Sequence, residues 1–444
     1  MNETDEVPFG IRKQEFLFSR CSLVLPSGIV ILYDCLRYVF ETPSVDCRLG
    51  CFCPVPDSQG AAFSVAALPS TPEEFDHAAE RQRLEARYPA MHGDIKKARS
   101  VKQSCSAKVK PSSSGISFFV PTVIGNQTFK MIYDTALPIC EYLPASASWI
   151  ETNTQLNRWV YSNESSPFQS LDHPTYVPTS SAELLKNYNW SIKYAFRDEV
   201  SGVVFTDTVK AGPVVAHKQA VQAATVIQAE FASDGILGLA FSTINTVQPK
   251  KQKTFFETLL PTLKKKVFAA NLRLDGKPAT WDFGYIDDTK FKGKVAYTPV
   301  VSQKYWSMNV SSYAVGKGSF TSSIKQVGEV ILDSGTSLVY LPKAVVNDYH
   351  SHIKGYELQK GGTRTFPCNS TIPDFHFKVD STTLSIPGRD VNYTVYDPAN
   401  RICAGVITTQ LNSKYSVLGN LFMRNYYVVH SQEEATPKLG FASH

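Results

Sequence analysis

Met131-Ile132-Tyr133-Asp134-Thr135-Ala136 has a near copy in the second half of the chain, Val330-Ile331-Leu332-Asp333-Ser334-Gly335-Thr336. In each stretch an apolar run ends on an acid, which is followed by a hydroxyl residue and a very small residue. Each is followed by an element of the form apolar-Leu-Gly-x-x-Phe, at 236–241 and at 417–422. A pattern repeated in this way indicates two related halves. We therefore expect Asp134 and Asp333 to face each other where the halves meet.

A single aspartate at the end of an apolar strand is most simply a turn residue, because burying an unpaired charge is costly. Recurrence with the same neighbours in both halves favours a functional site instead. Two carboxyls a few ångströms apart cannot both ionise easily, so the pair would share one proton over the acidic range. The charged member could take a proton from a held water, while the protonated member donates to an oxygen of a bound molecule. This chemistry requires neither a metal nor a covalent intermediate.

The composition suits a β-rich protein, with 21 Tyr, 26 Phe, 25 Gly and 26 Pro among 444 residues. Short alternating runs such as 202–207 are typical of strands bounded by turns. A chain of this length can bury a large core and divide into lobes. The formal net charge of +5 is too small and too scattered to indicate nucleic-acid binding. We find no phosphate-binding glycine loop and no zinc-spaced His/Cys set in the later part of the chain, so we expect no cofactor and no metal.

Several longer stretches identify a family resemblance over about residues 117–442. They are Asp234-Gly235-Ile236-Leu237-Gly238-Leu239-Ala240-Phe241, Asn245-Thr246-Val247-Gln248-Pro249, Asp282-Phe283-Gly284-Tyr285-Ile286-Asp287, Tyr427-Val428-Val429 and Leu439-Gly440-Phe441. The sequence resembles pepsin-like (A1) aspartic endopeptidases, especially the fungal branch typified by aspergillopepsin and penicillopepsin. The resemblance implies a mostly β, bilobal pepsin-like fold, in which two antiparallel β lobes related by a pseudo-two-fold enclose a cleft. It also implies a monomer that binds an extended peptide or protein substrate and pepstatin-type inhibitors.

The same resemblance assigns the site residues. The expected catalytic pair is Asp134 and Asp333, supported by Thr135, Ser334, Gly335 and Thr336, with Tyr194 and Phe196 on a flap over the substrate and a disulfide between Cys368 and Cys403. Thr135 and Ser334 take the positions whose hydroxyls join the two lobes in the family. The two cysteines lie 35 positions apart. A bridge between them would stabilise the fold by roughly 3–4 kcal/mol in the chain-entropy model. Two buried free thiols are the alternative.

The first half of the site departs from the family pattern. Ala136 and Leu137 follow Thr135 where the family has Gly-Ser, and Glu141 replaces a tryptophan that supports the flap tyrosine. Leu137 removes a hydroxyl that would hydrogen-bond Asp134, which should raise the pKa of that acid relative to the family. The flap also loses its two glycines, because Tyr194 is followed by Ala-Phe-Arg.

These departures leave three functions open. The first is an aspartic endopeptidase that hydrolyses peptide bonds in acid between large apolar residues. The second is a proteolytically inactive homologue repurposed as a small-molecule cyclase or isomerase in fungal biosynthesis. The third is a binding-only pseudoprotease. A fold does not fix a function, so the scaffold motifs alone do not choose among them.

Phe196 bears on specificity. Some fungal relatives carry an acid at this position of the flap, which lets them accept lysine before the cleaved bond. A phenyl ring cannot pair with an ammonium, and Arg197 beside it would repel one. The ring would instead extend an apolar wall, where burial contributes about 25 cal/mol per Å². We therefore expect poor cleavage after lysine; in the alternative, the ring only packs on a neighbouring loop.

Location and processing are read from sequons, cysteines and the first hundred residues. Six Asn-x-Ser/Thr sequons favour a secreted protein, or one of the secretory pathway or vacuole: Asn126, Asn163, Asn189, Asn309, Asn369 and Asn392. Nine cysteines are an odd number, so at least one is free or bonded between chains.

The apolar run at 22–33 is too short to span a bilayer, so we expect no membrane span. The run is either a signal-peptide core or part of a misassigned gene start. We assign 1–100 to a leader or propeptide-like region, 101–290 to an N-terminal lobe and 291–444 to a C-terminal lobe.

Restoring the family pattern around Asp134 should increase peptidase activity. We expect Ala136→Gly, Leu137→Ser and Glu141→Trp together to raise the rate by roughly tenfold or more, because a hydrogen bond to a charged acid is worth about 1.5–3 kcal/mol. The measurement is the initial rate of casein hydrolysis in acid. A rebuilt protein no faster than its parent would place the defect in the flap, or show that the chain has another task.

Overall fold

The computed structural model describes residues 17–24, 30–37, 102–136, 159–161, 173–193, 199–227, 231–321, 327–360, 362–410 and 415–444. The chain divides into two compact units, Met1–Phe75 and Asp76–His444. In the first unit, β1 (Leu17–Val24) pairs antiparallel with β2 (Val30–Arg37). The apolar run at 22–33 therefore falls on the end of β1, the start of β2 and the segment that joins them. The clustered cysteines at 47, 51 and 53, which have no matching His/Cys set that would make them a metal site, lie outside the described residues.

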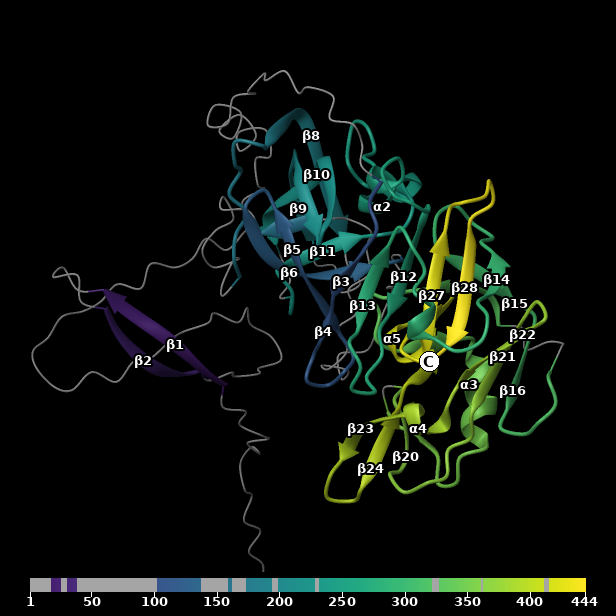
Figure 1. The fold of residues 1–444 in the computed structure, drawn as a ribbon. Helices are drawn as coiled ribbons and strands as arrows, with labels where there is room; N and C mark the ends of the chain where they lie inside the picture. The colour runs from purple at the N-terminus through teal and green to yellow at the C-terminus, as the bar shows by residue number, and fades with distance from the viewer. Residues whose placement is uncertain are drawn as a thin grey trace, which may run out of the picture. The chain divides into compact units, whose positions relative to one another are not determined.

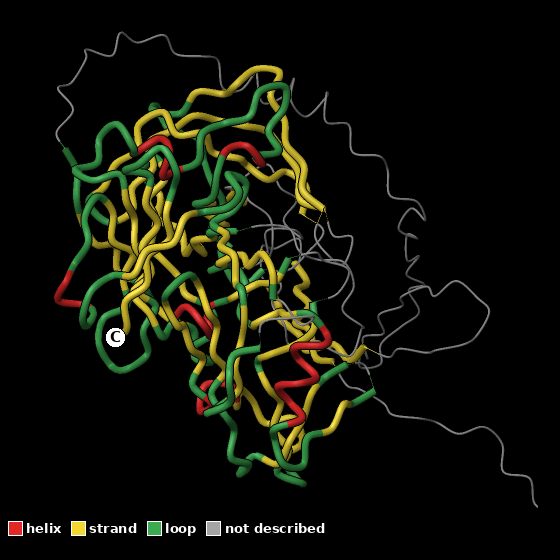
Figure 2. Tube along the Cα trace, turned by 90° about the vertical axis from the view of Figure 1, so that its right-hand side faces the viewer, coloured by secondary structure: helices red, strands yellow, loops and turns green. Residues whose placement is uncertain are grey.

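The second unit is mostly β, as predicted, and its described strands form five sheets. Figures 1 and 2 show strands throughout this unit, with helices confined to a few short segments. The longest, α3 (Lys343–Ser351), buries Val345, Val346 and Tyr349 on one face. The other helical segments are η1 (Ser242–Ile244), α2 (Phe255–Leu259), η2 (Asp288–Lys290), α4 (Gly388–Val391) and α5 (Asn420–Met423). Among the described residues, no helix combines the length and the apolar character that crossing a bilayer requires.

An eight-stranded sheet contains the first of the two repeated motifs. Its strand order is β4-β5-β6-β11-β7-β10-β9-β8, and β5 also pairs with β9, so the sheet folds back on itself. Burial alternates along β5 and becomes continuous at the end of β6, where the strand has neighbours on both sides. The strands are β4 (Lys110–Pro111), β5 (Phe118–Ile124), β6 (Gln127–Asp134), β7 (Trp159–Tyr161), β8 (Glu183–Lys193), β9 (Glu199–Ala211), β10 (Val214–Ile227) and β11 (Gly235–Gly238).

Three sheets form the second half, and the five-stranded one, in the order β15-β17-β26-β18-β25, contains the second motif. The others are the three-stranded β16-β21-β22 and the four-stranded β19-β20-β24-β23. The strands are β15 (Ser307–Val310), β16 (Ser312–Val315), β17 (Gly328–Leu332), β18 (Val339–Leu341), β19 (Glu357–Leu358), β20 (Arg364–Pro367), β21 (Phe375–Val379), β22 (Thr382–Ile386), β23 (Asn392–Asp397), β24 (Ile402–Gly405), β25 (Ile407–Thr409) and β26 (Ser416–Leu418).

The repeated elements pair in the same way in both halves. In the first, β11 runs parallel to β6 and places Gly238 opposite Asp134. In the second, β26 runs parallel to β17 and places Leu418 opposite Leu332. Each apolar-Leu-Gly element therefore lies beside the strand that leads to its acid, as expected of a duplicated architecture.

A six-stranded sheet joins segments from the two ends of the second unit, in the order β14-β28-β27-β12-β13-β3 (Figure 1). Its strands are β3 (Cys105–Lys108), β12 (Val267–Asn271), β13 (Thr280–Phe283), β14 (Ala296–Pro299), β27 (Tyr426–Ser431) and β28 (Lys438–Ser443). On one face His430 stacks on Phe268 with ring centroids 4.3 Å apart, and Trp306 meets His430 edge-on. Burial lowers the pKa of His430 to about 3, so this histidine belongs to the apolar core as a neutral ring.

One disulfide stabilises the four-stranded sheet. Cys368, directly after β20, is bonded to Cys403 in β24, as the family resemblance implied. Cys105 is a free cysteine. The four residues of β3 that begin with it pair with β13, so the edge of the six-stranded sheet depends on this short strand.

A buried carboxylate anchors β3 to the sheet. Asp282 on β13 is 0% exposed. It accepts hydrogen bonds from Lys290 Nζ at 2.7 and 2.8 Å, from the Tyr427 hydroxyl at 2.8 Å and from the Ser106 hydroxyl. Because Ser106 lies on β3 and Tyr427 on β27, one charge connects three strands of the sheet. A buried charge is tolerated only with this number of partners.

Removing the cation from this network should be strongly destabilising. We expect Lys290→Met to lower the free energy of unfolding by about 3–5 kcal/mol, because it leaves the Asp282 carboxylate buried without a counter-charge. Urea denaturation followed by tryptophan fluorescence measures the change. The matched control is Lys438→Met, whose partner Glu434 is 64% exposed and which should cost less than about 1 kcal/mol. Equal losses in the two variants would contradict the role assigned to the network.

Candidate active site

The two repeated acids lie at equivalent strand ends. Asp134 is the last residue of β6, and Asp333 directly follows β17. The Leu239 N–H donates to the Asp134 carbonyl at 2.7 Å, and the Asp333 N–H donates to the Leu418 carbonyl at 3.0 Å. The apolar-Leu-Gly element of each half thus fixes the backbone of its acid. Asp134 is 0% exposed and Asp333 1%.

Reciprocal hydrogen bonds join the residues that follow the acids. The Thr135 N–H donates to Ser334 Oγ at 3.1 Å, and the Ser334 N–H donates to Thr135 Oγ1 at 3.1 Å. Each hydroxyl then donates to a carbonyl of the opposite half: Thr135 Oγ1 to Leu332 at 3.0 Å, and Ser334 Oγ to Tyr133 at 2.6 Å. Both side chains are buried. This exchange couples the position of one acid to that of the other.

Asp333 is surrounded by hydrogen-bond donors. Its Oδ1 accepts from the Gly335 N–H at 2.8 Å and from the Thr336 N–H at 3.2 Å. Its Oδ2 accepts from the Thr336 hydroxyl at 2.6 Å. Both Gly335 and Thr336 thus donate to the carboxyl of the second loop.

Asp134 has fewer donors than Asp333. Its Oδ1 accepts from the Ala136 N–H at 2.9 Å. Its Oδ2 is buried and has no hydrogen-bond donor among the described residues. The two acids therefore occupy equivalent backbone positions in unequal surroundings.

Burial raises the pKa of both carboxyls. The pKa of Asp134 lies well above its ordinary value, first because of desolvation and then because of the charge of Asp333. Desolvation raises the pKa of Asp333 to about 6, although the donors on Thr336 and Gly335 oppose the rise. The direction agrees with a pair that retains a proton in weak acid.

The loops pack closely at this point. A Cβ on Gly335 would overlap the Asp134 carboxyl, so the second loop requires glycine here. Ala136 holds the matching position of the first loop and is fully buried.

Two residues that the sequence did not single out also join the halves. Asn420 Nδ2 donates to the carbonyls of Ile116 and Ser334, both at 3.0 Å. Trp306 Nε1 donates to the Leu239 carbonyl at 3.0 Å. Asn420 is the polar residue within the second apolar-Leu-Gly element. A polar side chain inside an otherwise apolar element was the sequence feature that could have identified its role.

Several predicted site residues are not placed by the structure. Leu137, Glu141, Tyr194, Phe196, Arg197 and Asn163 lie outside the described residues. Of the other sequon asparagines, Asn126, Asn309 and Asn369 are exposed, whereas Asn189 and Asn392 are partly buried. The Asn392 side-chain amide donates to the Cys368 carbonyl at 3.1 Å.

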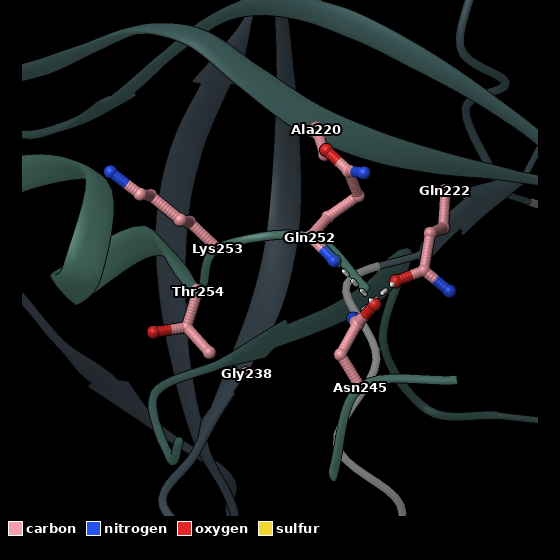
Figure 3. Close-up of a pocket in the computed structure, with 7 residues that line it drawn as sticks. All are labelled: Ala220, Gln222, Gly238, Asn245, Gln252, Lys253 and Thr254. Carbon is pink, nitrogen blue, oxygen red and sulfur yellow. Dashed lines mark hydrogen bonds between the residues drawn. The ribbon is translucent and has the colours of Figure 1, made fainter. Parts of the chain in front are cut away.

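A small pocket in the first half is lined by neither of the two acids (Figure 3). Asn245 connects two of its walls, because its Oδ1 accepts from the Gln252 N–H at 3.0 Å and its Nδ2 donates to Gln222 Oε1 at 3.4 Å. The remaining lining residues are Ala220, Gly238, Lys253 and Thr254. This set contains no acid and no nucleophile paired with a base, so we assign it no chemistry.

Comparison with known proteins gives the family. The model of the eukaryotic aspartyl protease family matches residues 155–444, which include Asp333 and begin after Asp134. Penicillopepsin-1 of Penicillium rubens is 37% identical over 346 residues, covering 77% of this chain and 81% of the relative. Aspergillopepsin-1 of Aspergillus fumigatus is 35% identical over 346 residues, with 76% and 81% covered. The chain therefore belongs to the eukaryotic aspartyl protease family, as a pepsin-like aspartic endopeptidase of the fungal type.

Proposed function

We propose that this protein hydrolyses peptide bonds in acid, with Asp134 and Asp333 as its catalytic pair. The observation that carries the proposal is the placement of two buried carboxyls at equivalent strand ends, coupled by the Thr135–Ser334 hydrogen bonds. Two acids held in this way can share one proton and act together on a water molecule and an amide carbonyl.

The proposed reaction uses general acid–base catalysis. The charged carboxyl takes a proton from a water held between the pair, and the water oxygen attacks the amide carbon. The protonated carboxyl donates to the carbonyl oxygen as charge develops there. The resulting tetrahedral diol breaks its carbon–nitrogen bond when the amine nitrogen receives a proton.

The proposed substrate is an extended peptide with large apolar residues on both sides of the cleaved bond. Support comes from the sequence at the flap, where Phe196 replaces an acid and Arg197 follows it. Secretion is proposed from the six sequons and from the Cys368–Cys403 disulfide, since such bonds persist in oxidising compartments.

A proteolytically inactive homologue is the second candidate. Ala136 and Leu137 depart from the family pattern, and Asp134 Oδ2 has no donor among the described residues. An acid pair with altered support could bind a peptide without cleaving it, or act on a small molecule instead.

Loss of either acid should abolish proteolysis. We expect Asp333→Asn and Asp134→Asn each to reduce casein hydrolysis by at least about a thousandfold, because the reaction needs both a proton donor and a base. Release of acid-soluble peptides, with and without pepstatin, measures the rate. The control Glu434→Gln changes an exposed acid and should retain full activity. Pepstatin binding by an intact, inactive parent would support the second candidate.

The rate should follow a bell-shaped dependence on pH. Burial raises the pKa of both carboxyls, with that of Asp333 at about 6, so the pair loses its first proton only in weak acid. Below that step the base is protonated, and above the second step the proton donor is lost. We therefore expect kcat/KM to fall as the pH drops below about 6 and to fall again above the second step, measured on a chromogenic peptide. A rate that keeps rising as the pH falls below about 5 would contradict the raised pKa of Asp333 and the proposed acid–base roles.

A further inference from the structure

We propose that a lysine-rich surface around α2 binds an anionic polysaccharide whose charged groups are sulfate or phosphate esters. Such a contact holds the protein on a polymer through residues that take no part in the acid pair. The choice of polymer rests on the proposed acidic, extracellular function, but the binding itself does not require turnover.

The positive charge of the chain is concentrated around α2. Residues 250–266 contain six lysines and a single acid, Glu257, so this stretch carries a formal charge of +5. The whole chain also carries +5, and the charges of all its other residues therefore cancel. The six lysines are all exposed: Lys250, Lys251, Lys253, Lys264, Lys265 and Lys266. The positive charge is thus more concentrated than its small total suggested.

The single acid of this stretch is directed at the backbone. Glu257 Oε1 accepts from the Ser242 N–H at 2.9 Å, and its Oε2 accepts from the Thr254 N–H at 3.1 Å. The second bond belongs to the capping box with which α2 begins. The carboxylate is therefore committed to N–H groups at the start of the helix.

The packing of α2 leaves the lysines at the surface. Phe255, Phe256 and Leu259 are buried and fix the inner side of the helix. One lysine run, 250–253, precedes these residues, and the other, 264–266, follows them. The five helical residues rise about 8 Å, so the two runs flank a short element. Figure 3 shows the Lys253 side chain extending away from the residues that line the pocket.

Hydrogen bonds place another lysine beside the second run. The Lys264 N–H donates to the Gln103 carbonyl at 2.9 Å. The ammonium of Lys102 donates to the Pro261 carbonyl at 3.0 Å, and Lys102 is exposed. Lys102 therefore extends the positive surface on the side where the second unit begins.

Lys218 lies beside the first run. Gln219 Nε2 donates to the Lys253 carbonyl at 3.2 Å, so β10 contacts this run at the residue after Lys218. The strand is irregular between Ala216 and Gln219, and Lys218 is exposed with a φ of 52°. Left-handed backbone is uncommon for a residue with a Cβ, and strand irregularities of this kind re-aim side chains. We call the six lysines around α2, with Lys102 and Lys218, the lysine face.

Acids mark one edge of the lysine face. The Gln432 N–H donates to the Lys266 carbonyl at 2.8 Å, and Glu433 and Glu434 follow in the chain. Glu434 already pairs with Lys438 at 2.7 Å. The lysine face therefore ends at this loop.

The residue types of the lysine face favour a flexible, hydrated polyanion. Its segments 102–103, 218–219 and 250–266 contain lysine but no arginine. An ammonium is a compact, hydrated charge without the planar fork of arginine, and it suits charges that are spread along a polymer. The exposed large apolar side chains of the described chain all lie outside these segments. A bilayer therefore meets no residue that could insert, and nucleic-acid bases meet no ring on which to stack.

The acidic working range selects the anion. Carboxylates lose their charge as the pH approaches about 4, so an acidic peptide or a uronic-acid polymer would bind less tightly there. Sulfate esters and phosphate diesters are conjugate bases of much stronger acids and remain ionised. Because the proposed reaction takes place in acid outside the cell, an ester-bearing polysaccharide is the partner that fits both the charge and the setting.

The first experiment measures binding of the full chain to immobilised dextran sulfate at about pH 4.5. We expect binding that weakens steeply between about 50 and 200 mM salt, because the polymer releases counterions when lysines replace them. Neutral dextran should not bind, and polygalacturonate should bind at least about fivefold more weakly. No binding to dextran sulfate would overturn the proposal. Tighter binding to polygalacturonate, to phosphatidylglycerol vesicles or to oligothymidine would overturn the choice of partner.

The second experiment removes five charges from the lysine face or from elsewhere. Both variants have the same net charge, and both change exposed residues only. The face variant combines Lys250→Gln, Lys253→Gln, Lys264→Gln, Lys265→Gln and Lys266→Gln. The control variant combines Lys110→Gln, Lys210→Gln, Lys317→Gln, Lys343→Gln and Lys354→Gln. We expect the face variant to bind dextran sulfate at least about thirtyfold more weakly than the parent, and the control to stay within about threefold. Equal losses would show that net charge and not this surface controls binding, and would refute the proposal.

Two further variants separate binding from folding and from catalysis. Arginine at the same five positions keeps the charge and should bind within about threefold of the parent. Lys264→Gln with Lys265→Gln changes less of the surface and should still reduce the affinity at least about fivefold; unchanged affinity would contradict the proposal. If the parent cleaves no peptide, these affinities still decide the matter. A parent that cleaves peptides but does not bind dextran sulfate would overturn this inference and leave the proposed function intact.

Discussion

The reciprocal hydrogen bonds between Thr135 and Ser334 are the constraint on which the site depends. Each residue uses both its N–H and its hydroxyl across the boundary between the halves, within a buried setting. Water cannot replace these partners, so a shift of one half would leave several polar groups unsatisfied, at about 1–3 kcal/mol each. The separation of the two acids is therefore set by the neutral groups beside them and not by the acids themselves.

Around this constraint the strands that carry the acids repeat one backbone arrangement, whereas the side chains that follow the acids differ. β11 beside β6 and β26 beside β17 repeat one arrangement. The residues that follow each acid differ, and the protonation of the pair depends on them. Duplication supplied two equivalent positions, and a few substitutions after the acids gave them different electrostatic surroundings.

Much of this could be predicted from the sequence because the signals were local and repeated. The β-rich, bilobal class, the duplication of the acid motif and the family all followed from short motifs. The bridging roles of Asn420 and Trp306 could not be predicted, because each depends on a carbonyl far away along the chain. The network around Asp282 was missed for the same reason, since its partners come from β3, β27 and η2. Long-range polar contacts leave no periodic pattern in a sequence.

The six-stranded sheet determines when the site can exist during synthesis. It combines β3, near the start of the second unit, with β27 and β28, which reach Ser443. The strand that leads to Asp333 pairs with β26, which is synthesised among the last thirty or so residues of the chain. Asp134 can therefore be joined by a complete Asp333 loop only after that point. Closing contacts over such distances is entropically unfavourable and slow. A chain still being synthesised can therefore complete its first acid loop but not the pair, and any acid–base activity begins only when the final strands are in place.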